Sequence, residues 1–375
     1  MTQEYFMIIG IPKEIKPFEY RVAVTPEGVA EIIQNGHKVL IEKNAGIGSG
    51  FSDANYLSAG AEIKTQSEIY NDSNIIYKVK ELFPKEFSYL RDDLIVFTYL
   101  HSNAHPEMTD AFLNSGATGI AYEDIEDESG QFPLLKPMSE IAGKGGYIAA
   151  LQFMQSCHGG KGLLLSNVVG LSKPEIVIIG AGVAGLGATE LAVGFGNHVT
   201  ILDIDIVKLE TVKNLFDGKI ECLMNNKINL EKSLGKADVL INCILWPKSR
   251  TDHLIDRQML SLMKPGSLIV DVACDEGGAI ETCKATTHQD PVYEVDGIIH
   301  YCVDNIPSTF ARTSTYYLSQ STLPYLLKLA KNGVEEALKS DNGFRKGLSF
   351  YKGKLTLEET ALKQNREYVD SSNLF

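Results

Sequence analysis

The sequence predicts an α/β protein built from two doubly wound domains, the first of them discontinuous. Apolar, strand-like runs alternate with helix-sized segments along the chain, which is typical of parallel sheets covered by helices on both faces. A glycine-rich turn of the type that opens such a sheet begins only at Gly180, so that a whole domain precedes it. The chain of 375 residues is also longer than one hydrophobic core usually serves.

The first domain is predicted from alternating strand and helix patterns ahead of that turn. Strands are expected over residues 7–12, 38–43, 75–79, 94–100 and 116–123, and helices over residues 25–36 and 53–60. Turn residues and two prolines follow in the stretch DESGQFPLLKPMSEIAG, at residues 127–143. This break marks the first domain boundary.

The second domain is predicted from strongly apolar strands that alternate with helix-sized spacers. These strands are expected over residues 174–180, 198–205, 239–245 and 267–273. A long helical stretch then runs from residue 308 to residue 338, and we expect it to return to the first domain. We therefore assign residues 1–135 and 312–375 to the first domain and 136–311 to the second, and we expect the last residues, KQNREYVDSSNLF, to form a loose tail.

Composition limits the kinds of partner. Apolar residues make up 44% of the chain and charged residues 22%, which is the mixture of a globular protein. The formal net charge of −13 provides no basic stripe for nucleic acid or an anionic membrane, so a small-molecule partner is expected. Six scattered cysteines without a CxxC pair, together with an N-terminus unlike a signal peptide, predict a cytoplasmic location.

The motif GAGVAG predicts a dinucleotide site in a Rossmann-like second domain. Gly180 makes the tight turn, Gly182 lets backbone amides approach a pyrophosphate, and Gly185 allows the helix to pack against its strand. An apolar strand precedes the turn and a helix of small residues follows it, which is the context that such a motif requires.

Two aspartates follow strands of this second domain. Asp203 ends the next strand and is placed to bond the ribose hydroxyls, and no arginine adjoins it in sequence to receive a 2′-phosphate. NAD is therefore expected rather than NADP, although a solvated strand end is the alternative reading of Asp203. Asp275 lies just beyond another strand in CDEGG, where it is either a site residue or a turn aspartate that caps local amides.

Three polar residues of the first domain lie where strands are expected to end. Arg21 suits bidentate binding of a carboxylate, and Lys80 adds an ammonium charge. His101, at the end of VFTYLH, suits acid and base catalysis near neutral pH. Each of the three taken alone is more often a surface charge or a structural histidine, and their joint pattern favours a site.

These motifs, taken in order, resemble the alanine dehydrogenase family, which is related to the soluble NAD-binding part of proton-translocating transhydrogenase. The resemblance covers about residues 7–335, and the stretches that carry it are GIPKEIK, EYRVAVTPEGV, KVKE, FTYLH, PLLKPMSEIAG, GAGVAG, DVACDEGG, VDNIP and RTSTYYLSQSTLPY. It implies a homohexameric, NAD-dependent enzyme that interconverts L-alanine with pyruvate and ammonia by way of an imine, in a cleft between the two domains.

The resemblance also implies roles for individual residues. By motif position, Arg21 matches the arginine that binds the substrate carboxylate, Lys80 the catalytic lysine, and His101 and Asp275 the acid/base pair. Cofactor contacts carry over to Ser139 of PMSE, to the glycine turn with Asp203, and to Asn305 of VDNIP, which also adjoins the substrate. No metal is implied.

Three stretches depart from the usual family pattern. KGGYIAAL follows SEIAG in place of an arginine and small residues, WPKSRTDHLID brings a bulky Trp246 and Arg250, and Asp304 adds a carboxylate in VDNIP. Two alternatives therefore stay open. One is a dehydrogenase of another amino acid or of an opine-type secondary amine, and the other is a nucleotide-binding subunit that passes hydride to a partner protein.

Overall fold

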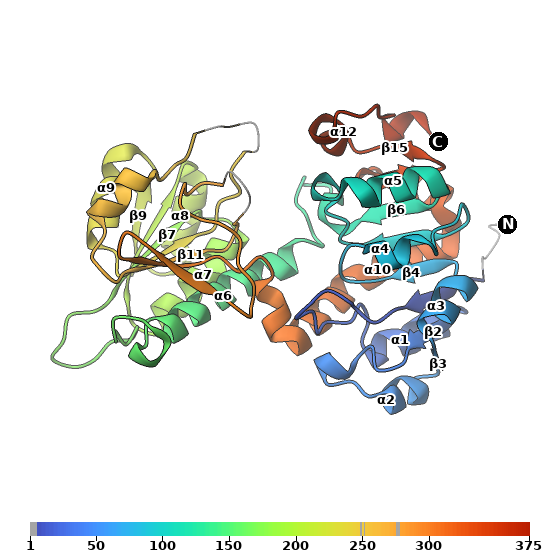
Figure 1. Ribbon diagram of the computed structural model, residues 1–375, viewed down its shortest axis with the longest axis horizontal. Helices are drawn as coiled ribbons and strands as arrows, with labels where there is room; N and C mark the ends of the chain where they lie inside the picture. Colours follow the sequence, from blue (N-terminus) through green and yellow to red (C-terminus); the bar gives the residue numbers. More distant parts are fainter. Residues whose placement is uncertain (1–5, 248–249, 251, 275–277) are drawn as a thin grey trace. The chain divides into compact units, whose positions relative to one another are not determined.

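The computed structural model describes residues 6–247, 250, 252–274 and 278–375. The chain divides into two compact units (Figure 1). Unit 1 combines Met1–Pro137 with Ala311–Phe375, and unit 2 is Met138–Phe310. Each unit contains a twisted sheet with helices, and the α/β fold class predicted from the sequence is confirmed.

Unit 1 contains a sheet with strand order β15-β14-β6-β5-β4-β1-β2-β3. The strands are β1 (Ile8–Ile11), β2 (Lys38–Glu42), β3 (Glu62–Lys64), β4 (Ile75–Tyr77), β5 (Ile95–Thr98), β6 (Thr118–Ala121), β14 (Leu348–Tyr351) and β15 (Lys354–Leu355). Pairing is parallel from β6 across to β3, and β14 and β15 are antiparallel. The carboxyl ends of β6, β5, β4 and β1 therefore lie side by side at one edge.

Helices cover this sheet. They are α1 (Pro26–Gln34), α2 (Asp53–Ser58), α3 (Gln66–Asp72), α4 (Pro84–Phe87), α5 (Pro106–Ser115), α10 (Ala311–Lys339), α11 (Asn342–Lys346) and α12 (Glu358–Gln364). The start of α1 shows why the chain turns helical there, because Thr25 caps the amide of Gly28 and Pro26 occupies the first turn. Strands β4, β5 and β6 are buried along their whole length, which is why they read as continuous apolar runs.

Helix α10 fastens the loop that follows β1. Thr315 accepts the amide of Val22 at 3.1 Å, and Ser319 accepts the amide of Thr25 at 3.3 Å. The helix is not one straight rod, since Gly333 has a positive φ of 72° and divides it. Residues 293 and 294 positions apart in the chain thus hold the segment that contains Arg21.

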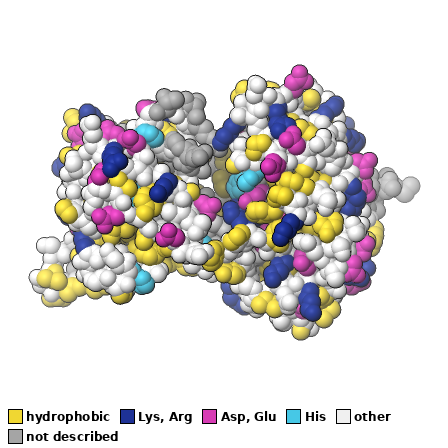
Figure 2. Space-filling model, viewed as in Figure 1, with side chains coloured by type: hydrophobic (Ala, Val, Ile, Leu, Met, Phe, Trp, Pro, Cys, Tyr) yellow, Lys and Arg dark blue, Asp and Glu magenta, His cyan; other side chains and the backbone are white. Residues whose placement is uncertain are grey.

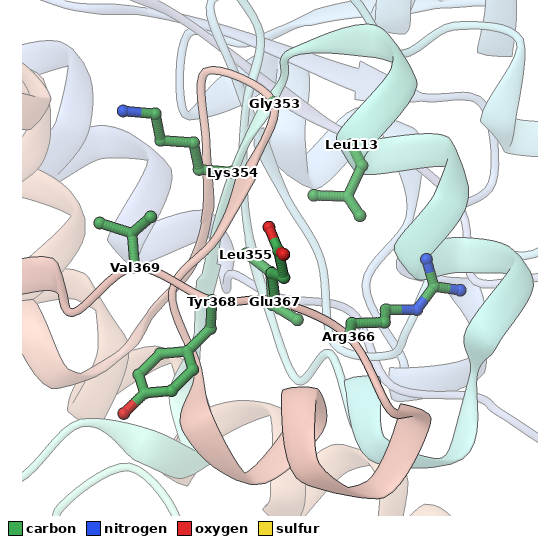
Figure 3. A pocket seen from close by; sticks show the side chains of 8 residues that line it. All are labelled: Leu113, Gly353, Lys354, Leu355, Arg366, Glu367, Tyr368 and Val369. Atoms are coloured by element: carbon green, nitrogen blue, oxygen red, sulfur yellow. The ribbon is translucent and has the colours of Figure 1, made fainter.

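The C-terminal tail is ordered, so the prediction of a loose tail is wrong. Val369 donates its amide to the carbonyl of Leu355 at 2.9 Å, and Arg366 pairs with Asp110 at 2.6 Å. With Leu113 of α5 and the β14–β15 hairpin, the tail lines a hollow of about 410 Å³ (Figure 3). Backbone pairing and one ion pair order a segment that lacks hydrophobic periodicity.

Unit 2 contains a sheet with strand order β12-β13-β11-β10-β7-β8-β9. The strands are β7 (Glu175–Ile179), β8 (His198–Asp203), β9 (Glu221–Met224), β10 (Val239–Asn242), β11 (Leu268–Asp271), β12 (Val292–Val295) and β13 (Ile298–Tyr301), and β12 alone among them is antiparallel. The chain moves outward from β7 through β8 to β9, then returns to β10 on the other side of β7. Ligands of open α/β sheets bind at such a reversal.

The helices of unit 2 pack through glycines. They are α6 (Lys136–Phe153), which begins at the unit boundary, α7 (Val183–Gly194), α8 (Ile206–Leu215) and α9 (Lys227–Lys236). A Cβ at Gly143 of α6 would overlap the carbonyl of Ala184, and one at Gly187 of α7 would come within 2.7 Å of the carbonyl of Glu140. Gly143, just before KGGY, and Gly187 therefore let α6 lie directly against the helix that follows the glycine turn.

Candidate functional site

The glycine turn of unit 2 has the geometry that its sequence predicts. Gly180 follows β7 with a φ of +100°, a conformation that favours glycine, and Gly182 is the N-cap of α7. A Cβ at Gly185 would overlap the carbonyl of Gly180. A Cβ added at Gly182, in contrast, meets no described atom within 4 Å. Space thus remains open directly before the N-terminus of α7, where backbone amides and the helix dipole favour an anion.

This open space belongs to a pocket of about 770 Å³ within unit 2. Its lining combines apolar with polar and charged side chains, and includes Gly180, Gly182, Asp203, Ile204, Lys208, Asn225, Lys227, Leu230, Ile244, Leu245, Trp246, Arg250 and Met259. A pocket of this size, with polar groups beside a helix N-terminus, suits a dinucleotide. The residues present therefore fit the cofactor that the glycine turn predicts.

Asp203 ends β8 at the wall of this pocket and is 8% exposed. Its Oδ2 accepts the amide of Ala181 at 2.6 Å, and its Oδ1 accepts the amide of Asp205 at 2.8 Å. Each carboxylate oxygen has a second lone pair, so these bonds leave capacity for ribose hydroxyls. The aspartate also holds the glycine turn, a structural role that the motif alone did not reveal.

Trp246 and Arg250, which depart from the family pattern, line the same pocket as Asp203. The Arg250 guanidinium lies 4.4 Å from the centre of the Trp246 ring and pairs with Asp252. No arginine adjoins Asp203 in the sequence. In the folded unit an arginine shares the pocket, but its charge is engaged by Asp252.

Unit 1 brings the three predicted polar residues to one edge of its sheet. Arg21 follows β1, Lys80 follows β4 and His101 follows β5, and these strands are neighbours. Beyond the effect of burial, the charges of Lys16 and Arg21 oppose the charged form of Lys80. The same edge carries carboxylates that the sequence analysis did not select: Glu14, Glu19, Glu81 and Glu123.

Arg21 is 3% exposed and lies against Glu19. Its Nε donates to Glu19 Oε1 at 2.7 Å, and its second guanidinium nitrogen donates to Glu19 Oε2 at 2.5 Å. The fork is thus held in a fixed plane by a carboxylate two residues away. Beside it is a pocket of about 490 Å³, which is also lined by Lys13 and Lys16.

Lys80 is buried beside Glu81, with Nζ 3.5 Å from Glu81 Oε2. Burial lowers the pKa of Lys80, although Glu81 opposes the shift. Burial would raise the pKa of Glu81, but the charges of Lys80 and Lys16 outweigh it and lower the value. Glu14 fixes the backbone here, because its Oε1 accepts the amides of Val79 at 2.7 Å and Lys80 at 3.3 Å.

His101 adopts a left-handed conformation, with a φ of +46°. Its side chain is 42% exposed and stacks on Tyr99, with ring centres 5.8 Å apart. Partial burial of the ring on the side that packs against the protein, followed by the charge of Lys80, lowers the pKa of His101 below its usual value. The imidazole is therefore neutral at neutral pH and able to accept a proton.

The remaining predicted residues lie in unit 2. Ser139 is half-buried near the start of α6, and Asn305 is 6% exposed, with a carbonyl that accepts from Ser308 Oγ at 2.9 Å. Neither is among the described residues that line the pocket at Gly182. Asp275 lies outside the described residues. Asp304 is exposed and donates its amide to Thr286.

The carboxylates at the edge of unit 1 were missed although a signal for them exists. Glu81 directly follows Lys80 in KVKE, and Glu123 closes AYE at the end of a predicted strand. Acidic residues near strand ends are common at solvated surfaces, so the sequence pattern alone did not distinguish them. What distinguishes them in the structure is burial: Glu81 is 3% exposed and Glu14 is 6% exposed.

Charges of both signs are intermixed over the face shown in Figure 2. Among the helices that the structure describes, none has the length and apolarity that a membrane span requires.

The glycine turn, the pocket in front of it and the acidic end of β8 define a dinucleotide-binding α/β protein. Its other α/β unit, unit 1, presents arginine, lysine and histidine at one sheet edge.

The chain belongs to the alanine dehydrogenase/PNT family. The family model "Alanine dehydrogenase/PNT, N-terminal domain" matches residues 10–142, and "Alanine dehydrogenase/PNT, C-terminal domain" matches residues 146–358. The resemblance found in the sequence motifs is thereby confirmed at the level of the family.

Curated relatives and solved structures agree with this assignment. The chain is 45% identical to an alanine dehydrogenase of Methanococcus maripaludis, covering 97% of this chain and 98% of the relative. It is 44% identical to an alanine dehydrogenase of Bacillus subtilis, with 97% and 96% covered. A solved L-alanine dehydrogenase matches with a TM-score of 0.91 at 39% identity over 96% of this chain and 99% of the other. A transhydrogenase of Sinorhizobium meliloti matches with a TM-score of 0.78 at 25% identity, over 94% and 99%.

Proposed function

We propose that this protein is an NAD-dependent L-alanine dehydrogenase, which converts L-alanine, NAD and water reversibly into pyruvate, ammonia and NADH. The observation that carries the proposal is the pairing of two features in one chain. Unit 1 presents Arg21, Lys80 and His101 at adjacent strand ends, and unit 2 presents a pocket at a glycine turn with Asp203. Full-length similarity to curated alanine dehydrogenases supports the choice of substrate.

In unit 1, the proposed task of Arg21 and Lys80 is to bind the substrate carboxylate. The plane of the Arg21 guanidinium is fixed by Glu19, so the group is oriented before substrate arrives. The buried Lys80 adds a positive charge in surroundings where water screens it weakly. Together they select substrates that carry a carboxylate.

His101 is the proposed proton acceptor and donor of unit 1. NAD, when bound, supplies the acceptor for the hydride that leaves Cα of the amino acid. His101, neutral at neutral pH, accepts a proton as water adds to the resulting imine, and returns it to nitrogen as ammonia leaves. Asp275 is the proposed second acid/base group, by motif position alone.

In unit 2, the proposed cofactor contacts begin at the glycine turn. The N-terminus of α7 at Gly182 receives the pyrophosphate, and Asp203 receives the ribose hydroxyls. Ser139 and Asn305 are proposed as further cofactor contacts, and Asn305 also as a substrate contact, because they match family motifs. An uncompensated carboxylate at Asp203 disfavours a 2′-phosphate.

The family resemblance supports a homohexamer located in the cytoplasm. Sedimentation of the purified protein at micromolar concentration tests the assembly: a single monomer of 41.2 kDa would contradict it. Proteins of this size class that work as symmetric oligomers sediment as one larger species.

One assay tests the proposed activity. Reduction of NAD is measured across a panel of L-amino acids and secondary amines, beside oxidation of NADH with pyruvate and ammonium. L-alanine should give the highest kcat/KM. A higher value with another amino acid or an opine-type amine would reassign the substrate. If none of these compounds is a substrate, the alternative function is favoured, in which the protein is a subunit that passes hydride to another protein.

A further inference from the structure

We propose that Glu123 is a positioning residue for His101, an inference that rests on the proposed function. The carboxylate of Glu123 faces the histidine from the neighbouring strand. Its Oε1 accepts the amide of His101 at 2.5 Å and the amide of Leu100 at 3.1 Å. The same oxygen lies 3.7 Å from Nδ1 of the His101 ring.

The sheet register brings the two residues together. Thr98 of β5 pairs with Ala121 of β6, so the residues just after both strands meet at one edge. Glu123 is the second residue beyond β6 and His101 the third beyond β5. The carboxylate therefore approaches the histidine by parallel pairing and not by proximity in the chain.

The hydrogen bonds explain how His101 keeps its unusual backbone. A left-handed conformation costs a non-glycine residue about 1–2 kcal/mol, and it persists where surrounding bonds determine it. Glu123 accepts two successive amides, while the carbonyl of His101 accepts the amide of Ala104 at 3.0 Å. This conformation sends the ring back against Tyr99 and sets the direction of both nitrogens.

We expect the charge of Glu123 to act on the ring as well, because its Oε1 lies 3.7 Å from Nδ1. Other groups that face His101 are Lys80, Lys16 and His105, which disfavour the protonated ring, and Glu81, which favours it. A carboxylate beside Nδ1 favours a proton on that nitrogen and leaves Nε2 as the acceptor. Burial raises the pKa of Glu123 to about 7, against the opposing effect of the His101 amide. Glu123 therefore becomes negatively charged as the pH rises through about 7.

Glu123 supports the reaction through His101. Its side chain is 15% exposed, and the contacts described here are to the backbone amides and ring of the turn. Removal of its charge should therefore act chiefly on how His101 holds a proton. Glu123 also interacts with the charge of Lys80, so a smaller change in the binding of the substrate carboxylate is expected.

Glu123→Gln is the central variant, because the amide oxygen can still accept the two backbone amides while the charge is lost. We expect the variant to have a Tm similar to that of the wild type and a KM for pyruvate within about twofold of the wild-type value. Its kcat should be lower than that of the wild type by roughly tenfold. In the wild type, protonation of Glu123 should lower kcat below about pH 7. This fall should be absent in Glu123→Gln. Glu128→Gln, at an exposed acid five residues along, is the matched control and should behave as the wild type.

A second measurement does not depend on turnover. Diethyl pyrocarbonate modifies neutral imidazole, and mass spectrometry of the His101 peptide follows the rate against pH. His101 stays neutral through neutral pH because its pKa is lowered to about 3, whereas Glu123 ionises near pH 7. In the wild type the rate should therefore change as the pH passes through about 7, because the carboxylate then forms beside Nδ1, and this change should be absent in Glu123→Gln. The same pH profile in both proteins, with an unchanged kcat, would overturn the proposal. Loss of the change near pH 7 in a protein that oxidises no amino acid would uphold it and overturn the proposed function instead.

Discussion

The amide of Ala181 donates a 2.6 Å hydrogen bond to Oδ2 of Asp203, which joins the glycine turn to the end of the next strand. One carboxylate thus shapes the turn that we propose faces the pyrophosphate, and it presents charge at the wall of the same pocket. The turn and the cofactor preference are therefore coupled in this protein, and a change at Asp203 should alter both.

Asp203→Asn tests the cofactor preference. The neutral amide removes the repulsion that a 2′-phosphate would meet, so the ratio of kcat/KM for NAD to that for NADP should fall by roughly tenfold or more, about 1.4 kcal/mol. Asp205→Asn, which preserves an N-cap residue on α8, is the control and should leave the ratio unaltered. A wild-type protein that uses NADP faster than NAD would show that Asp203 has another role.

Gly182→Ala should separate folding from cofactor binding. The φ of −80° suits alanine and the added Cβ meets no described atom within 4 Å, so Tm should stay close to that of the wild type. The methyl group nevertheless enters the space before α7, and NAD affinity measured by calorimetry should fall at least about tenfold. Gly194→Ala, also in open space, should retain affinity. Normal NAD binding by Gly182→Ala would place the pyrophosphate elsewhere.

Gly185→Ala should fail in the opposite way. Its Cβ would overlap the carbonyl of Gly180, so the strand and helix must move apart, at a cost of about 1–3 kcal/mol for an overpacked site. Thermal unfolding of the protein without cofactor should show a lower Tm for Gly185→Ala than for the wild type. Unaltered stability would mean that the turn adjusts more easily than its close contacts suggest.

Arg21, His101 and Asp275 should differ in their kinetic effects. Arg21→Ala should raise KM for pyruvate as well as lower kcat, and Arg21→Lys should restore little because an ammonium lacks the bidentate fork. His101→Ala and Asp275→Ala should lower kcat roughly a hundredfold with little change in NAD affinity. Steady-state kinetics and circular dichroism of each variant provide the measurement. Near-normal turnover by His101→Ala would remove it from the proposed chemistry.

Asp271 should make stability depend on pH. It is 1% exposed at the end of β11, and burial raises its pKa from 3.8 to about 7. Since the folded state holds this proton more tightly than the unfolded state, its stabilising effect is complete below about pH 4 and is lost as pH rises to about 7.

The variant Asp271→Asn cannot ionise, so its free energy of unfolding relative to wild type should rise over that pH window by up to a few kcal/mol. Denaturant unfolding at several pH values measures the difference, with Asp290→Asn at an exposed position as control. A constant difference across the window would show that Asp271 ionises as readily in the folded chain as in the unfolded one.

The sequence by itself determined the features that depend on local chemistry. Gly180 and Gly185 mark their turn because a positive φ at Gly180 and a close backbone approach at Gly185 demand glycine, whatever the rest of the chain does. The apolar strands were recognisable because parallel strands are buried on both faces. The tail beyond Gln364 had no such signal, since its order comes from Leu355 and Asp110 in distant parts of the chain.

Only the tertiary structure decided which charged groups meet. Glu123 reaches His101 because β6 pairs with β5, and Arg250 shares a pocket with Asp203 because the chain returns past β7 to form β10. An acidic or basic residue after a strand looks alike in sequence whether it is solvated or buried against an opposite charge. Strand order and register supply that difference, because they set the distances over which charges and hydrogen bonds act.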